Sequence, residues 1–96
     1  MGRALAVAIG FASIAAVAVA SAEPPAGAAA CSGCHPASTR VTSPVPRLAG
    51  LDRATIVRAM QDFRSGQRAS TVMDRIAKGF TDAEIQAIAT WYATQR

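Results

Sequence analysis

Cys31-Ser32-Gly33-Cys34-His35 is the stretch that decides the fold of this chain, because it contains both cysteines and the only histidine among the 96 residues. The pattern Cys-x-x-Cys-His is typical of covalent haem attachment, in which each thiol adds to one haem vinyl group and the imidazole binds the iron. The same residues also allow a redox dithiol or a disulfide in an exported protein, or zinc binding. We favour one covalently attached haem c, because zinc needs further Cys or His ligands and the sequence has no βαβ pattern of a dithiol oxidoreductase.

The first 22 residues have the composition of an export signal. Arg3 precedes an uncharged apolar run over 4–20, and residues 20–22 read Ala-Ser-Ala, which is the small-x-small pattern of a cleavage site. A membrane anchor is the alternative, but the run is shorter than the about 20 residues of a span and is mainly alanine, which inserts weakly. We therefore predict a cleaved signal peptide over 1–22, a periplasmic location, no stable membrane insertion after cleavage, and one haem-binding domain over 23–96.

The charge pattern limits the possible partners. The formal net charge is +4, and removal of Arg3 leaves nine basic against six acidic residues, a net charge of +3. Two ionised haem propionates would bring this value close to +1. The arginines are scattered and no aromatic platform lies between them, so nucleic acid is not expected as a partner and most arginines should lie on solvated helix faces. Arg47, Arg75 and Lys78 are candidates to contact either the propionates or an acidic redox partner.

The domain is predicted to contain only helices and loops. An alanine-rich first helix over 26–34 carries the two thiols and is stopped by Pro36. Residues 38–50 form a loop by composition. A second helix begins after the N-cap Asp52 and ends at Gly66. One face of this helix carries an apolar stripe at helical spacing, formed by Ile56, Met60 and Phe63.

Two further helices are predicted after this one. Ser70 caps a short helix that contains Met73, and Gly79 closes it. Thr81 and Glu84 form a capping box that opens the last helix. One face of the last helix is apolar and consists of Ile85, Ile88, Ala89 and Tyr92.

The second axial position of a haem iron needs a ligand other than histidine, because His35 is the only one. Met60, Met73 and an open position are the alternatives. Met60 belongs to an apolar stripe, where packing in the core is the default role of methionine. Met73 follows a polar loop over 65–70 that could bring it to the haem face opposite His35, so we favour Met73. A thioether ligand keeps iron low-spin and leaves no vacant site, which suits single-electron transfer, whereas an open site suits gas binding or peroxide chemistry.

The chain resembles class I c-type cytochromes, and most closely the cytochrome subunit of flavocytochrome c sulfide dehydrogenase, with cytochrome c4-like proteins next. The resemblance covers nearly all of residues 23–96. Its specific part is the sequence that follows the haem motif. The blocks that carry it are Pro46-Arg47-Leu48-Ala49-Gly50-Leu51, Met60-x-Asp62-Phe63-x-Ser65-Gly66-x-Arg68 and Ser70-Thr71-Val72-Met73-x-Arg75-Ile76-Ala77-Lys78-Gly79-Phe80.

The resemblance implies a small class I cytochrome c fold, with three main helices and a short one wrapped round one covalently bound haem. It implies that Cys31 and Cys34 form the thioethers and that His35 and Met73 are the axial ligands. A proline carbonyl in the loop after the motif accepts the other imidazole N–H in this family, and Pro44 is the best match by position. The loop departs from the family pattern, because Ser replaces the usual Gly before Pro44 and the span from His35 is slightly shortened.

The resemblance also implies a function. We expect a periplasmic monohaem carrier of single electrons that accepts them from a flavoprotein dehydrogenase of the sulfide-oxidising type. A free, diffusing shuttle to an oxidase or another dehydrogenase is the first alternative, and a haem sensor with a labile sixth ligand is the second. The sequence contains no nucleophile, paired carboxylates or phosphate loop, so we do not expect the chain to be an enzyme by itself.

Overall fold

Two helices of equal length make up most of the helical structure in the described residues. The structure is a computed structural model, and it describes residues 1–2, 9–10, 12–13, 15–16 and 23–95. Four helices occur in these ranges: α1 (Ala28–Cys31), α2 (Arg53–Ser65), α3 (Met73–Lys78) and α4 (Asp82–Thr94). No strand occurs in this part of the chain, and the predicted all-α class is confirmed. The long helices α2 and α4 have 13 residues each, whereas α1 has four and α3 has six.

The N-terminal segment is described only in part. Most of the predicted signal peptide over 1–22 lies outside the described residues, so its cleavage stays a prediction. Among the residues that are described, no helix has the length and apolar character needed to cross a membrane.

The ends of α2 agree with the sequence signals. The Asp52 carboxylate accepts a hydrogen bond from the Thr55 backbone N–H at 3.3 Å, and Gly66 ends the helix in the left-handed conformation with φ 79°. Ile56 is buried in the core, and Met60 packs against it. Two of the three residues of the predicted stripe therefore face the core, whereas Phe63 is half-buried and has the Arg68 guanidinium 5.0 Å from its ring centroid.

The capping box of α4 is also confirmed. The Thr81 hydroxyl accepts a hydrogen bond from the Glu84 N–H at 3.2 Å, and the Glu84 carboxylate accepts one from the Thr81 N–H at 3.1 Å. The residues that were predicted to share one face of this helix are all buried, namely Ile85, Ile88, Ala89 and Tyr92.

The first helix is shorter than the predicted span of 26–34. Gly27 adopts the left-handed conformation with φ 86°, so regular helix begins only at Ala28. After Cys31 the chain continues in hydrogen-bonded turns rather than helix, and the described part thus has two long and two short helices instead of three main ones.

The caps of α3 also differ in detail from the prediction. Val72 occupies the N-cap position, but the Ser70 hydroxyl still accepts a hydrogen bond from the Asp74 N–H at 3.0 Å. Gly79 follows the helix with φ −80°, which any residue can adopt, so its role does not depend on the left-handed region.

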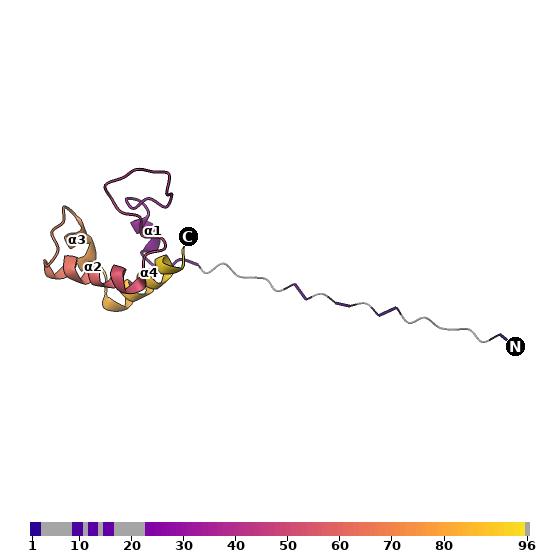
Figure 1. The fold of residues 1–96 in the computed structure, drawn as a ribbon. Helices are drawn as coiled ribbons and strands as arrows, with labels where there is room; N and C mark the ends of the chain where they lie inside the picture. The colour runs from indigo at the N-terminus through magenta and orange to yellow at the C-terminus, as the bar shows by residue number, and fades with distance from the viewer. Residues whose placement is uncertain (3–8, 11, 14, 17–22, 96) are drawn as a thin grey trace.

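The core lies where α4 packs against α2 and α1. Its buried members are few: Ala28, Ile56, Val57, Ile85, Ile88, Ala89 and Tyr92. The Tyr92 hydroxyl donates a buried hydrogen bond of 2.6 Å to the Ala28 carbonyl, which fixes α1 on α4 across 64 residues of sequence. In the view of Figure 1, α1 and α3 lie on the same side of the long helices, and the loop of residues 36–50 extends beyond α1.

Candidate haem-binding site

The cysteines and the histidine of the motif lie in one turn at the end of α1. The N–H groups of Cys34 and His35 both donate to the Cys31 carbonyl, at 3.2 and 3.0 Å. Cys31 is partly buried and packs against the core, whereas Cys34 is exposed, and both thiols are free. The turn therefore presents two thiols that form no disulfide and an imidazole, all within five consecutive residues, and covalent attachment of haem needs both thiols.

The environment of Cys31 keeps its thiol protonated. Burial raises the pKa of the Cys31 thiol, although hydrogen bonds that its sulfur accepts from its own backbone N–H and from Tyr92 act in the opposite direction. Burial also raises the pKa of Tyr92, and the nearby Cys31 adds to this shift because two negative charges would repel each other. Both groups are thus neutral at pH 7.

His35 is oriented by a backbone carbonyl. Its Nδ1 lies 2.5 Å from the Pro46 carbonyl oxygen. A carbonyl can only accept, so Nδ1 carries the proton and Nε2 of the neutral imidazole is left with a free lone pair. A metal-binding histidine commonly has its other ring nitrogen fixed in this way, and the bond strengthens the imidazole as an electron donor to a metal.

The acceptor is Pro46, and the assignment to Pro44 is wrong. The Ser43 hydroxyl accepts a hydrogen bond from the Val45 N–H at 3.1 Å, and the chain bends at Pro44 and Val45. This bend leaves Pro44 exposed and brings the next proline carbonyl to the imidazole. The signal was present in the sequence, because Pro46 opens the block that runs to Gly50, whereas Pro44 lies outside it.

The basic residues proposed for propionate or partner contacts lie in two different places. Arg47 is half-buried, and its Nε donates a hydrogen bond of 3.0 Å to the Ala37 carbonyl, so this side chain binds the loop itself. Arg75 and Lys78 are exposed in the last turn of α3. Only this second pair presents its charges freely to a partner.

The two methionines have different surroundings. Met60 is partly buried against the core cluster, which agrees with a packing role. Met73 is the first residue of α3 and is half-buried. Its neighbours Val72 and Ile76 leave 51% and 42% of their surfaces exposed, although both are large apolar residues.

The exposed apolar side chains provide a test of whether a haem fits these residues. In the described part of the chain, only Ile85 is a large side chain that is fully buried. Large apolar side chains are instead exposed in the 36–51 segment after the motif and next to Met73, namely Val41, Leu51, Val72 and Ile76. The flat, apolar macrocycle of haem would cover apolar side chains in these two segments. The donor set and the incomplete core therefore both fit haem.

A bare metal ion fits less well. The described residues contain no group of three or more His, Cys, Asp or Glu side chains that could hold one.

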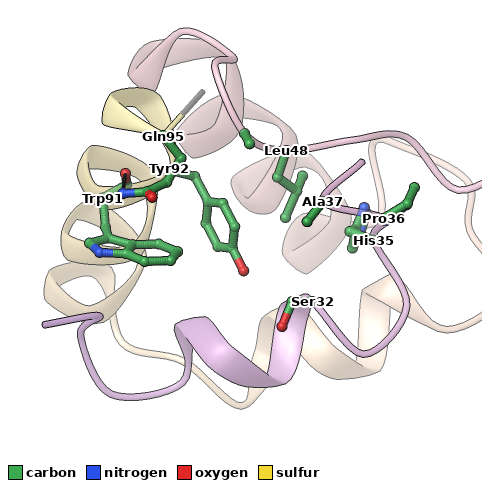
Figure 2. A pocket seen from close by; sticks show the side chains of 9 residues that line it. Ser32, His35, Pro36, Ala37, Leu48, Trp91, Tyr92 and Gln95 are labelled. Atoms are coloured by element: carbon green, nitrogen blue, oxygen red, sulfur yellow. Dashed lines mark hydrogen bonds between the residues drawn. The ribbon is translucent and has the colours of Figure 1, made fainter. Parts of the chain in front are cut away.

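A small cavity lies behind His35, between the motif, the loop and the end of α4 (Figure 2). Its volume is about 150 Å³, and its lining includes His35, Ala37, Leu48, Trp91 and Tyr92. Cofactor sites usually measure roughly 300–1,000 Å³, and neither the cysteines nor Met73 line this cavity. It is therefore a packing gap beneath the loop and not the haem site.

The chain is similar to several bacterial cytochromes. It is 42% identical over 62 residues to the cytochrome subunit of sulfide dehydrogenase of Chlorobaculum tepidum, a match that covers 65% of this chain and 56% of that protein. It is 38% identical over 96 residues to a thiosulfate dehydrogenase electron acceptor of Thiomonas intermedia, covering 97% of this chain and 44% of the relative. It is 34% identical over 65 residues to cytochrome c-552 of Acidithiobacillus ferridurans, covering 68% of this chain and 28% of that protein.

These relatives decide the class of protein. The chain matches no protein-family profile, and it spans between about a quarter and just over half of the length of the relatives. The relatives are nevertheless all cytochromes or electron acceptors, and the described fold is helical as their class requires. The chain is a class I c-type cytochrome.

Proposed function

We propose that this chain is a periplasmic monohaem c-type cytochrome that carries single electrons and accepts them from a flavoprotein dehydrogenase of the sulfide-oxidising type. The single observation that supports the proposal most strongly is the turn in which two free thiols accompany an imidazole whose Nδ1 is bound by the Pro46 carbonyl. This arrangement leaves Nε2 of His35 available for iron.

Each residue of the site has a chemical task. When bound, haem iron supplies a one-electron couple. Cys31 and Cys34 hold the group covalently: each S–H adds across a vinyl double bond, so that one S–C bond forms and the thiol hydrogen passes to the neighbouring carbon. This addition needs no oxidant, but it does need reduced thiols. His35 and Met73 are the proposed axial ligands, because thioether sulfur and imidazole together suit low-spin electron transfer.

The electron must come from another protein. The cavity next to the motif has a volume of about 150 Å³, which is smaller than the usual site for an organic substrate. The relative from Chlorobaculum tepidum is named as a subunit of sulfide dehydrogenase, which supports a sulfide-oxidising dehydrogenase as the donor. We therefore propose no catalytic role for the chain alone.

A second candidate donor is a thiosulfate dehydrogenase. The electron acceptor from Thiomonas intermedia aligns with 97% of this chain, a larger share than the sulfide dehydrogenase subunit does. In this case the chain would act as a diffusing shuttle and not as a bound subunit.

The test begins with the protein purified gently from its native periplasm, oxidised and then reduced while its absorption spectrum is recorded. Haem bands with flavin absorbance that bleaches on reduction would support the bound subunit, and sulfide is then the first donor to add. Haem bands without flavin would favour the shuttle, with thiosulfate as the next donor. A protein without any haem bands would refute both candidates.

The sixth ligand is tested by paired methionine variants. We expect Met73→Ala to open the iron and allow carbon monoxide to bind the ferrous protein at pH 7, whereas Met60→Ala should leave carbon monoxide binding unchanged and lower only stability. Met60 is a suitable control because it packs against the core. Easy binding of carbon monoxide to the unmodified protein would contradict ligation by Met73 and favour a sensor.

A further inference from the structure

We infer that Arg47 is a positioning residue for the axial histidine, and that it holds the Pro46 carbonyl against His35 by clamping the intervening loop to Ala37. This inference rests on the proposed haem site, but it concerns hydrogen bonds that this chain makes by itself. The two contacts involved are the 3.0 Å bond from Arg47 Nε to the Ala37 carbonyl and the 2.5 Å contact between His35 Nδ1 and the Pro46 carbonyl.

The two contacts join the same two short segments of the chain. Pro46 and Arg47 are adjacent on one side, and His35 and Ala37 are two residues apart on the other. The segment between them contains no helix or strand, and it is stabilised locally by hydrogen bonds within single turns, such as that from the Arg40 N–H to the Ser38 hydroxyl. The arginine thus bonds across the base of a loop of ten residues, next to the carbonyl that orients the imidazole.

Packing beneath the loop does not replace this bond. The cavity of about 150 Å³ lies between Ala37, Leu48 and Ala49 of the loop region and Trp91 and Tyr92 of α4 (Figure 2). Atoms that face a void lack attractive contacts on that side. The position of the Pro46 carbonyl therefore depends on the polar contacts at the base of the loop more than on a packed floor.

Loss of the hydrogen bond from Arg47 to Ala37 should shift the reduction potential of the haem in a predictable direction. A mobile Pro46 carbonyl would bind the His35 N–H less firmly, so the imidazole would donate less electron density and ferric iron would lose stabilisation. The reduction potential would then rise. Loss of a positive charge near the haem has the opposite effect, because ferric iron carries one more positive charge and gains when a neighbouring cation is removed. The direction of the change therefore separates a positioning role from a purely electrostatic one.

The experiment compares Arg47→Met with Arg40→Met in the haem-loaded protein. Both variants remove one positive charge from the same loop, but Arg40 is exposed and only the Arg47 side chain is bonded to Ala37. We expect Arg47→Met to increase the ratio of ferrous to ferric protein at a fixed solution potential by about threefold, which is about 28 mV when a tenfold change corresponds to ~59 mV. Arg40→Met should leave the ratio unchanged or decrease it.

A second readout follows the histidine directly. In the reduced, diamagnetic protein, nuclear magnetic resonance reports how fast the ring N–H of His35 exchanges with water. We expect at least about tenfold faster exchange in Arg47→Met than in Arg40→Met, because a loosened carbonyl protects the proton less. Arg47→Leu, which likewise has no side-chain donor, takes the place of Arg47→Met if the latter does not retain haem, with the same direction expected.

The outcomes are separable from failure of the proposed function. The unmodified protein must first show haem bands and a reversible one-electron couple, and their absence refutes the proposed function before any variant is compared. If the couple is present, two results together would overturn the clamp. Arg47→Met and Arg40→Met would lower the reduction potential equally, and the exchange rate of the His35 ring N–H would not change. Arg47 would then have a charge effect only.

Discussion

Replacement of Gly27 by alanine is a sharp test of how the helices pack, because this glycine combines an unusual backbone conformation with a close approach. Its φ of 86° lies in the left-handed region, where a side chain costs roughly 1–2 kcal/mol. A Cβ added at Gly27 would also lie 2.5 Å from Cε1 and 3.2 Å from Cζ of Phe80. Non-bonded carbon atoms do not approach to 2.5 Å, so the ring or α1 would have to move. Overpacking of this kind costs roughly 1–3 kcal/mol.

Gly66 is the matched control for this substitution. Its φ of 79° is similar, but no atom lies within 4 Å of an added Cβ. Gly66→Ala therefore has the backbone cost alone, offset in part by the lower entropy of the unfolded chain, and we expect a loss of about 1 kcal/mol. For Gly27→Ala we expect a loss of about 2–4 kcal/mol in the free energy of unfolding.

Urea unfolding of the haem-loaded protein at pH 7 measures both values. Phe80→Leu provides the third side of a double-mutant cycle, since a smaller side chain should recover part of the cost of Gly27→Ala but none of the cost of Gly66→Ala. Equal losses for the two glycine variants, or no recovery with Phe80→Leu, would refute the close approach of Phe80 to α1.

Two further predictions concern α4. Tyr92→Phe keeps the buried ring but removes the hydroxyl that donates to the Ala28 carbonyl at 2.6 Å. It should lower the free energy of unfolding by about 1–2 kcal/mol, and a change below about 0.3 kcal/mol in urea unfolding would count against this bond. The backbone N–H of Thr81, and then its side chain, hold the pKa of Glu84 below its usual range. The carboxylate therefore stabilises the folded state above the unfolded pKa of about 4.3, and this contribution is lost as the pH falls through the lower folded pKa. Glu84→Gln cannot titrate, so its stability should fall less than that of the unmodified protein between pH 7 and pH 3, and parallel curves would contradict the assignment.

The sequence predicted those elements whose ends carry side-chain signals. Asp52 and Gly66 mark α2, and Thr81 with Glu84 marks the start of α4, because caps act through contacts within three or four residues. The length of α1 was overestimated. An alanine-rich run has high helix propensity throughout, but Gly27 has a left-handed backbone and packs closely against Phe80, and propensity reports neither feature.

In the candidate site, too, the features with local sequence signals were predicted and the others were not. The cysteines and His35 were assigned from consecutive residues, and the structure holds them in one turn. The carbonyl partner was misplaced by two residues, because the bend at Pro44 depends on a hydrogen bond from the Val45 N–H to the Ser43 hydroxyl. The bond from Arg47 to Ala37 could not be anticipated either, since it spans ten residues of irregular backbone and leaves no periodic signal.

The bond between Tyr92 and Ala28 has a consequence for the order of events during biosynthesis. A ribosome makes α1 first and α4 last, and Tyr92, which lies 64 positions after Ala28, must be present before α1 can dock. Closure of a loop of this length has an entropic cost of about 4 kcal/mol. Only burial of the apolar face of α4 offsets this cost. Until then the turn with Cys31 and Cys34 has no partner helix to shield it. Wherever the chain emerges with its N-terminus first, the segment that receives the prosthetic group therefore stays open to haem until α4 has followed.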